Sequence, residues 1–198
     1  KKRTVVSSYA RCVHFDDTTR LIGECINPTG RKVVKEALRS RDFGYLLREG
    51  SEQQACGADI LDVNAGLPGI DEAAVLCELV ERLQSVSDLP LQIDTADPEA
   101  LGRAMRRYNG KPMVNSVNGK QSSMESVFPL VQKYGGLVVA LTLDEAGIPE
   151  TVDGRIEIAK RIIRTAKNYG IGKEDLIFDA LTMTVSAGSQ NAAGTLET

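Results

Sequence analysis

The feature that most constrains the fold is a regular alternation of short apolar runs with helical patterns, beginning near Leu21. Six runs have the length and composition of buried strands. They are Leu21–Glu24, Ile60–Asn64, Leu91–Asp94, Met113–Ser116, Leu137–Leu143 and Leu176–Asp179. Strands that are separated by single helices must run parallel, because the chain returns to the same edge of the sheet by a crossover. The sequence therefore predicts a repeated βα architecture.

Three of the intervening segments carry helix signals. Asp97-Pro98 predicts the start of a helix with a buried face at Leu101, Ala104, Met105 and Tyr108. Ser122 and Glu125 have the spacing of a capping box, ahead of a buried face at Val127, Phe128 and Val131. The third helix is expected from about Asp153 to Gly170, with its apolar face at Ile156, Ala159, Ile163 and Ala166.

A Rossmann-type sheet and a (β/α)8 barrel both satisfy this pattern. No GxGxxG turn follows the first strand, which removes the best dinucleotide signal. Polar residues instead stand at the ends of nearly all the strands, where a barrel builds its active site. These residues are Glu24, Asp62, Asn64, Asp94, Asn115 and Asp179. We therefore expect the α/β fold class and a TIM barrel.

A closed barrel of this kind usually takes about 250 residues, so the chain is expected to hold about six of its eight βα units. Residues 1–20 are interpreted as a lead-in or a linker from an upstream domain. Residues 21–198 are interpreted as the barrel, incomplete at its C-terminus. Within the second strand, the alternation of side chains places Asp62 and Asn64 on the inner face and Leu61 on the outer face.

Composition excludes several classes of function. A net charge of -3 and a pI near 5.4 give no surface for neutralising nucleic-acid phosphates. The four cysteines form no CxxC pair, so neither a metal site nor a disulfide framework is indicated, which suits a reducing cytoplasm. No apolar run approaches the roughly 20 residues that cross a bilayer. The predicted partners include neither nucleic acid nor a membrane.

Three inward polar groups, Asp94, Asn115 and Asp179, suit a flat heterocycle. The amino group and ring N–H of a pterin can donate two hydrogen bonds to a carboxylate, and a carboxamide can both donate and accept along the same edge. The alternative is structural, because Asp and Asn at strand ends often cap the next helix or fix a turn. For any one of these residues taken alone, the two interpretations remain open.

Several ordered motifs add a specific resemblance. The run Ile22–Gly30, with sequence IGECINPTG, resembles the IGERxNxTG opening of folate domains in cobalamin-dependent methionine synthases and related corrinoid methyltransferases. The later matching segments are Leu61–Asn64, Gln92–Thr95, Val114–Gly119, Leu141–Pro149 and Ile177–Asp179. The similarity extends from about Leu21 to Gly188.

The resemblance implies a pterin-binding barrel, related in fold to dihydropteroate synthase, that holds 5-methyltetrahydrofolate at its C-terminal face. It implies that Asp94, Asn115 and Asp179 bind the pterin, and that Glu24, Asn27 and Asn64 contribute to the same substrate site. Asp94 is the catalytic candidate within the chain. A further family Asn, which is expected to bind N5, would lie beyond Thr198.

The implied reaction transfers the N5-methyl group to cob(I)alamin carried by a separate corrinoid-binding domain, and so serves methionine synthesis from homocysteine. An upstream homocysteine-binding domain would fit this function. The alternatives are a stand-alone methyltetrahydrofolate:corrinoid protein methyltransferase and a folate-binding fragment without turnover. Two positions depart from the family pattern. Cys25 stands where Arg is usual, and Ala180 follows Asp179 where Pro is common.

Overall fold

The structure is a computed structural model that describes residues 2–16, 18–182 and 195–198. Its strands are β1 (Val5–Ser7), β2 (Cys12–His14), β3 (Ile22–Ile26), β4 (Ile60–Asn64), β5 (Leu91–Asp94), β6 (Met113–Asn118), β7 (Leu137–Leu141) and β8 (Leu176–Asp179). Its helices are α1 (Lys32–Ser40), α2 (Phe43–Ala55), α3 (Glu72–Leu83), α4 (Pro98–Arg107), α5 (Gln121–Tyr134) and α6 (Val152–Asn168), with a 3-10 turn η1 (Lys173–Asp175). All six predicted strands are confirmed, three with their predicted bounds.

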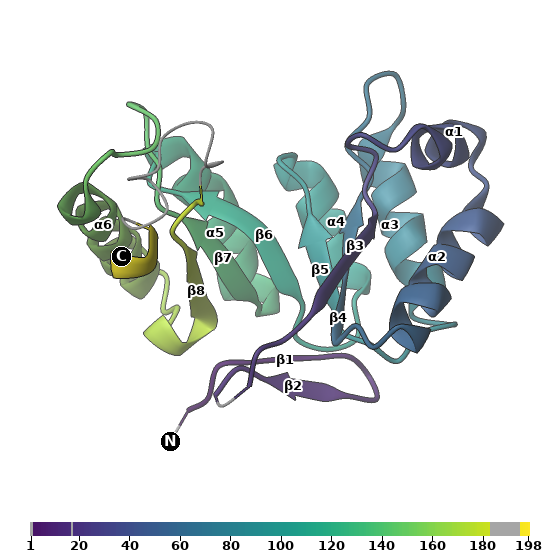
Figure 1. Ribbon diagram of the computed structural model, residues 1–198, viewed down its shortest axis with the longest axis horizontal. Helices are drawn as coiled ribbons and strands as arrows, with labels where there is room; N and C mark the ends of the chain where they lie inside the picture. Colours follow the sequence, from purple (N-terminus) through teal and green to yellow (C-terminus); the bar gives the residue numbers. More distant parts are fainter. Residues whose placement is uncertain (1, 17, 183–194) are drawn as a thin grey trace. The chain divides into compact units, whose positions relative to one another are not determined.

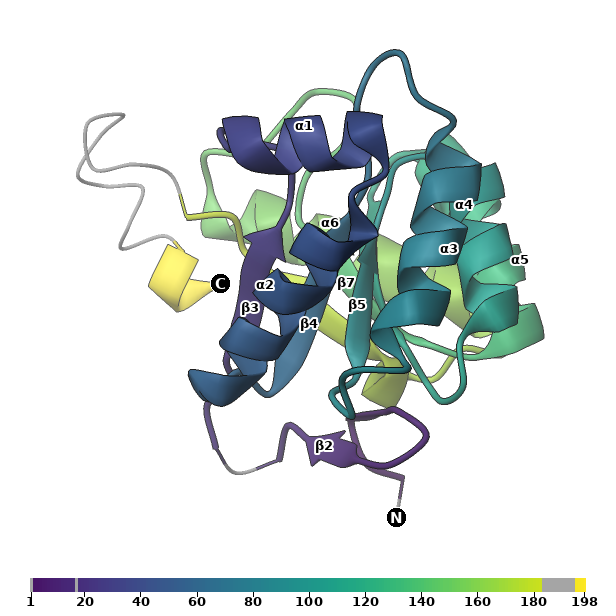
Figure 2. The same cartoon turned by 90° about the vertical axis from the view of Figure 1, so that its right-hand side faces the viewer.

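The chain divides into two compact units, which are described separately. The first contains the residues up to Asn115 together with Tyr134–Leu137. Within it, β3, β4, β5 and the start of β6 are neighbours in that order and run parallel. Helices α2, α3 and α4 cover one face of these strands, and α1 packs against α2 near their carboxyl ends (Figures 1 and 2).

Helix α2 packs closely against β4 and α3 in the first unit because Gly50 of α2 has no side chain. A Cβ atom on Gly50 of α2 would lie 2.9 Å from Leu83 and 3.5 Å from Leu61. Leu61 therefore faces the helices, as the alternation along β4 predicts, and the polar side chains of that strand face the other way. In α4, the predicted cap and buried face are confirmed, since Asp97 accepts from the Glu99 backbone N–H and the predicted apolar side chains are buried.

A hairpin formed by β1 and β2 packs at the amino ends of the strands of this unit (Figure 1). Ser7 pairs with Lys111, just ahead of β6, and the Ser8 hydroxyl donates to the Asp88 carbonyl ahead of β5. The Tyr108 hydroxyl donates to the Ser7 carbonyl and accepts from the Leu91 N–H. Tyr108 thus joins the end of α4 to both the hairpin and the sheet.

The second unit contains Ser116–Lys133 and the described residues of Val138–Thr198. It holds the end of β6 and strands β7 and β8, with β7 and β8 parallel and Leu141 aligned with Asp179. Gly119 ends β6 where only glycine fits, because its Cβ would lie 2.9 Å from the Leu143 carbonyl oxygen. Each strand from β3 to β7 is thus followed by a crossover that carries at least one helix.

Two helix predictions in the second unit are wrong in detail. Helix α5 already begins at Gln121, so Ser122 lies inside its first turn and does not cap it. The hydroxyl of the next residue, Ser123, accepts from the Asn118 N–H instead. Helix α6 buries the predicted Ala166, but its other buried residues, Arg155, Ile158 and Ile162, each lie one position before the predicted Ile156, Ala159 and Ile163. Ile163 is 38% exposed.

Within the described residues, every helix is too short or too polar to cross a membrane.

Candidate functional site

Polar side chains collect at the carboxyl ends of the strands of the first unit. Asn64 is aligned with Asp94, and Asp94 is aligned with Asn115, so the ends of β4, β5 and β6 lie side by side. The Asn64 side-chain N–H donates to Asp94 Oδ2 at 2.8 Å. The Asn64 side-chain oxygen Oδ1 accepts from the Gly66 N–H, which fixes this side chain against the turn after β4. Three of the predicted site residues are therefore brought together.

Two residues before Asn64 and Asp94 on the same strands, Asp62 and Gln92 form a buried polar pair. Asp62 is 1% exposed, and its Oδ1 accepts from Gln92 Nε2 at 2.5 Å. Among the described residues, neither Asp62 Oδ2 nor Gln92 Oε1 has a hydrogen-bond partner. A buried acceptor without a donor is costly, so this pair is suited to a ligand or a proton that supplies one.

The electrostatics of the cluster favour neutral acids. The pKa of Asp62 is raised to about 7, chiefly by burial and also by the carboxylates of Asp94 and Glu24, against the lowering effect of hydrogen bonds from Gln92 and Asn115. Burial also raises the pKa of Asp94, against the hydrogen bond from Asn64. Carboxylates that crowd one another in a dry site cannot all be ionised at low cost, so protons are retained there near neutral pH.

The loop after β3 contributes Asn27, which is 7% exposed and donates to Glu24 Oε1 at 3.2 Å. Its side-chain oxygen Oδ1 accepts from the Thr29 N–H and fixes the turn. Cys25 is followed at a short distance by Arg31, whose guanidinium donates to the Cys25 carbonyl oxygen and pairs with Glu49 at 3.0 Å. A cation is thus present on this loop, although the expected Arg is absent.

Asp179 belongs to the second unit. It lies at the carboxyl end of β8, is exposed, and its Oδ1 accepts from the Leu181 N–H at 2.7 Å. Its carbonyl oxygen accepts from the backbone N–H and the hydroxyl of Thr142. The structure therefore gathers Glu24, Asn27, Asn64, Asp94 and Asn115 in one unit, and Asp179 stands at a strand end of the other.

Gln92 was missed as a site residue, and Asp62 was predicted only to point inward. The signal that finds Gln92 is the alternation along β5, because Gln92 and Asp94 are two residues apart and share a face. The apolar surroundings of Gln92 conceal its role, since a Gln in a strand is usually solvated.

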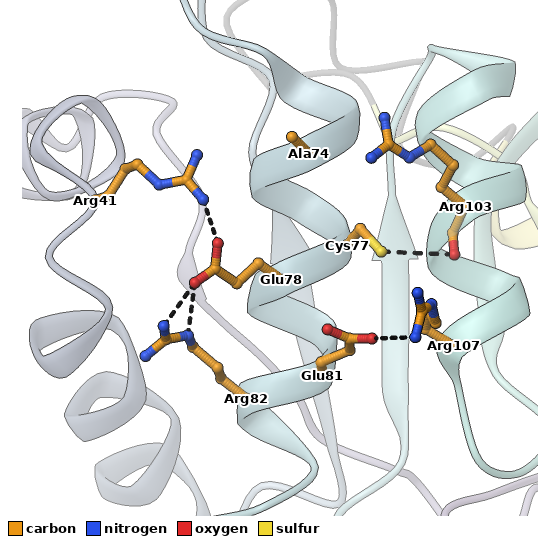
Figure 3. Close-up of a pocket in the computed structure, with 8 residues that line it drawn as sticks. All are labelled: Arg41, Ala74, Cys77, Glu78, Glu81, Arg82, Arg103 and Arg107. Carbon is orange, nitrogen blue, oxygen red and sulfur yellow. Dashed lines mark hydrogen bonds and ion pairs between the residues drawn. The ribbon is translucent and has the colours of Figure 1, made fainter.

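A hollow with a volume near 430 Å³ lies on the outer surface between α3 and α4, apart from the polar cluster. Its arginines are largely engaged by neighbours: Glu78 pairs with Arg41 and Arg82, and Glu81 pairs with Arg107 at 3.0 Å (Figure 3). We interpret it as an ion-pair network that ties the helices together. In the described part of the chain, no group of three His, Cys, Asp or Glu residues could hold a metal ion.

Comparison with known proteins decides the family. The sequence profile described as "Pterin binding enzyme" matches residues 23–196. The chain belongs to the pterin-binding enzymes. This finding confirms the family that the ordered motifs indicate.

Among curated relatives, this pterin-binding chain is 33% identical over 178 residues to the methionine synthase of Mycobacterium leprae. It is 31% identical over 168 residues to the methylcorrinoid:tetrahydrofolate methyltransferase of Eubacterium limosum. These matches cover 87% and 84% of the chain, but only 15% and 62% of the two relatives. The chain thus corresponds to a small part of the first relative and to just under two thirds of the second.

Among solved structures, the Yersinia pestis dihydropteroate synthase matches 99% of this pterin-binding chain with a TM-score of 0.72. The identity is 15%, and the match covers 72% of that protein. The likeness confirms the predicted fold, a TIM-type barrel of the dihydropteroate synthase kind, of which the described residues form six parallel strands. At this identity it carries information about the fold alone.

Proposed function

We propose that the chain binds 5-methyltetrahydrofolate through its pterin ring and presents the N5-methyl group for transfer to a corrinoid held by a separate domain. The observation that carries this proposal is the polar cluster on β4 and β5, where two buried acceptors below the carboxyl ends, Asp62 Oδ2 and Gln92 Oε1, have no donor among the described residues. The relatives named methionine synthase and methylcorrinoid:tetrahydrofolate methyltransferase support the choice of a methylated folate.

The residues present fit a pterin. The ring edge carries an amino group and a ring N–H, which are the donors that Asp62 Oδ2 and Gln92 Oε1 require. Asp94 offers a carboxylate to the same edge, and Asn115 offers a carboxamide that both donates and accepts. The side chain of Asn64 holds Asp94 at 2.8 Å and so fixes the direction of its carboxylate. We expect Asp179 to add a further carboxylate contact to the ring.

The chemistry of methyl transfer makes proton management the task of this chain. A tertiary amine is a poor leaving group, so N5 must gain a proton or a strong hydrogen bond by the transition state. Asp62, with a pKa of about 7, can lose its proton at neutral pH and accept through Oδ2 from the amino and ring N–H edge of the pterin, so the proton for N5 must come from another group. Asp94 then binds and orients the ring. A reduced corrinoid, when bound by its own domain, supplies the nucleophile.

Two functions are compatible with methyl transfer to a corrinoid, and they differ in whether the methyl group then passes to a further acceptor. In a methionine synthase the methyl group goes on to homocysteine, which is the function we propose first, because the similarity to the Mycobacterium leprae protein has the higher identity. The alternative is exchange of methyl groups between a corrinoid protein and tetrahydrofolate. It is favoured by the larger share of the Eubacterium limosum protein that the chain covers.

The proposal is tested by binding and by transfer. Calorimetric titration with 5-methyltetrahydrofolate should give saturable binding, and Asp94→Asn should weaken it by about 10- to 150-fold, the equivalent of the 1.5–3 kcal/mol of a charged hydrogen bond. The matched control is Asp97→Asn, because Asp97 caps α4 and Asn caps equally well. Equal affinities of the two variants would remove Asp94 from the site.

Turnover is followed separately, by the absorbance change that accompanies methylation of cob(I)alamin under reducing conditions. The same protein is incubated with 4-aminobenzoate and a dihydropterin pyrophosphate, the substrates of the fold relatives. We expect methyl transfer and no dihydropteroate. Formation of dihydropteroate without methyl transfer would replace the proposed function by that of the fold relatives. Binding of the folate without either reaction would identify a binding module.

A further inference from the structure

Arg155, in the first turn of α6, is a charged side chain that is only 2% exposed. Its Nε donates to the Pro149 carbonyl oxygen at 3.1 Å, and its Nη1 donates to the Ala180 carbonyl oxygen and the Thr195 hydroxyl, both at 3.0 Å. None of these partners carries a charge. Burying a cation against neutral acceptors costs free energy, so we expect the buried Arg155 to have a structural or functional role that offsets this cost.

The contact with Ala180 identifies what Arg155 holds. Ala180 directly follows Asp179, and the next residue, Leu181, has a φ of 58°. A residue with a side chain is unfavourable in this left-handed region, so the turn tends to relax unless its neighbours hold it. Arg155 donates a hydrogen bond to the carbonyl oxygen of Ala180, the middle residue of the turn. The Asp179 side chain accepts from the Leu181 N–H at 2.7 Å.

The same turn fixes the direction of the Asp179 carboxylate. On one side, the Asp179 carbonyl oxygen accepts from Thr142, which is fully buried. On the other side, the Ala180 carbonyl is anchored by Arg155. Oδ1 is engaged within the turn, and no hydrogen bond in the described part of the chain involves Oδ2. The backbone is thus restrained on both sides of Asp179, and one carboxylate oxygen is left for a ligand.

We propose that Arg155 is a positioning residue that sets the Asp179 carboxylate for the pterin edge. This inference rests on the proposed function, in which Asp179 contacts the ring. Ala180 makes the contact more important, because alanine lacks the fixed φ that a proline at that place would give the turn. Burial of the Arg155 guanidinium costs desolvation free energy, and its hydrogen bond to Ala180 restricts the Asp179–Leu181 turn to one conformation.

The first test compares Arg155→Met and Arg155→Lys with Arg164→Met, which removes an exposed arginine from the same helix. Folding of each variant is checked by cooperative urea unfolding, and the dissociation constant of 5-methyltetrahydrofolate is measured by calorimetry. We expect a loss of affinity of about tenfold or more for Arg155→Met and a smaller loss for Arg155→Lys, which keeps the charge but only one group to donate. Arg164→Met should bind like the parent protein.

A double-mutant cycle separates positioning from general support of the fold. If Arg155 acts through Asp179, its substitution should change affinity less than about twofold once Asp179→Asn is present. The same loss of affinity in both backgrounds would overturn the inference. If Arg155→Met does not fold, the cycle uses Arg155→Lys.

The two proposals fail in different ways. Parent-like binding by the folded Arg155 variants, with Asp179→Asn impaired, would overturn the positioning role and leave the proposed function intact. A parent protein that does not bind 5-methyltetrahydrofolate would overturn both.

Discussion

At the scale of single residues, Asp62 is an ionisable side chain that is almost completely removed from water. It is 1% exposed, lies beside two other acids, and has one oxygen without a donor among the described residues. Burial raises its pKa to about 7, so at neutral pH the folded protein binds a proton that the unfolded chain releases. This difference in bound protons makes stability depend on pH.

The sign follows from the direction of the shift. Between about pH 4 and pH 7 the folded state binds more protons at Asp62 than the unfolded state, so the free energy of unfolding falls as pH rises. Asp62→Asn removes this dependence because asparagine does not titrate. We expect the variant to gain on the order of 2–4 kcal/mol relative to the parent protein between pH 5 and pH 8.

Urea unfolding of both proteins at pH 5 and pH 8 measures this difference, and Glu52→Gln, a change at an exposed acid on α2, is the control. The Asp62 and Glu52 variants should diverge only at the higher pH. Parallel stability profiles for all three proteins would mean that Asp62 is ionised in the folded state at neutral pH.

At the scale of elements, strands were predictable and helix faces less so. Runs such as Ile60–Asn64 and Leu91–Asp94 are buried on both faces, and their apolar residues mark them without knowledge of neighbours. In α6 the apolar pattern misplaced the buried stripe, because Arg155 occupies a buried position through hydrogen bonds to loops that the sequence does not show to be close. Gln92 was missed for a related reason, since its partner Asp62 lies on another strand.

The hairpin β1–β2 is joined to the sheet by the side chain of Tyr108, at the end of α4. The Tyr108 hydroxyl accepts from the Leu91 N–H at 3.1 Å and donates to the Ser7 carbonyl oxygen at 2.9 Å. Burial raises the pKa of Tyr108 to about 12, so the hydroxyl stays neutral and keeps its proton for Ser7. Tyr108→Phe would leave a buried N–H without an acceptor.

We expect Tyr108→Phe to lower the free energy of unfolding by about 1–3 kcal/mol, the penalty of an unsatisfied buried donor. Tyr9→Phe is the matched control, because Tyr9 is 62% exposed and the substitution is the same. Urea unfolding of the two variants checks the difference. A loss of the same size at both positions would show that the hydroxyl of Tyr108 does not couple the hairpin to the sheet.

At the scale of the whole molecule, the fold alone leaves the reaction open. Dihydropteroate synthases share the barrel at 15% identity in the example above, whereas the curated relatives at 33% and 31% identity are named methionine synthase and methylcorrinoid:tetrahydrofolate methyltransferase. One barrel can serve both chemistries because the strand ends, and not the barrel, contact the substrate. The sequence indicated the pterin through those strand ends. It could not supply the packing that makes Asp62 a neutral acid, because burial is a property of the folded chain.

A ligand that binds only the folded state should stabilise the whole chain. At a concentration 100 times its dissociation constant, 5-methyltetrahydrofolate should add about 2.7 kcal/mol, which raises the melting temperature by about 5–10 °C for a chain of 198 residues. Differential scanning calorimetry measures the shift. Because the proposed contacts are to the pterin edge, 4-aminobenzoylglutamate, which lacks that ring, should give a shift below about 1 °C at the same concentration. An equal shift with both compounds would place recognition in the glutamate tail and remove the cluster around Asp62 and Asp94 from substrate binding.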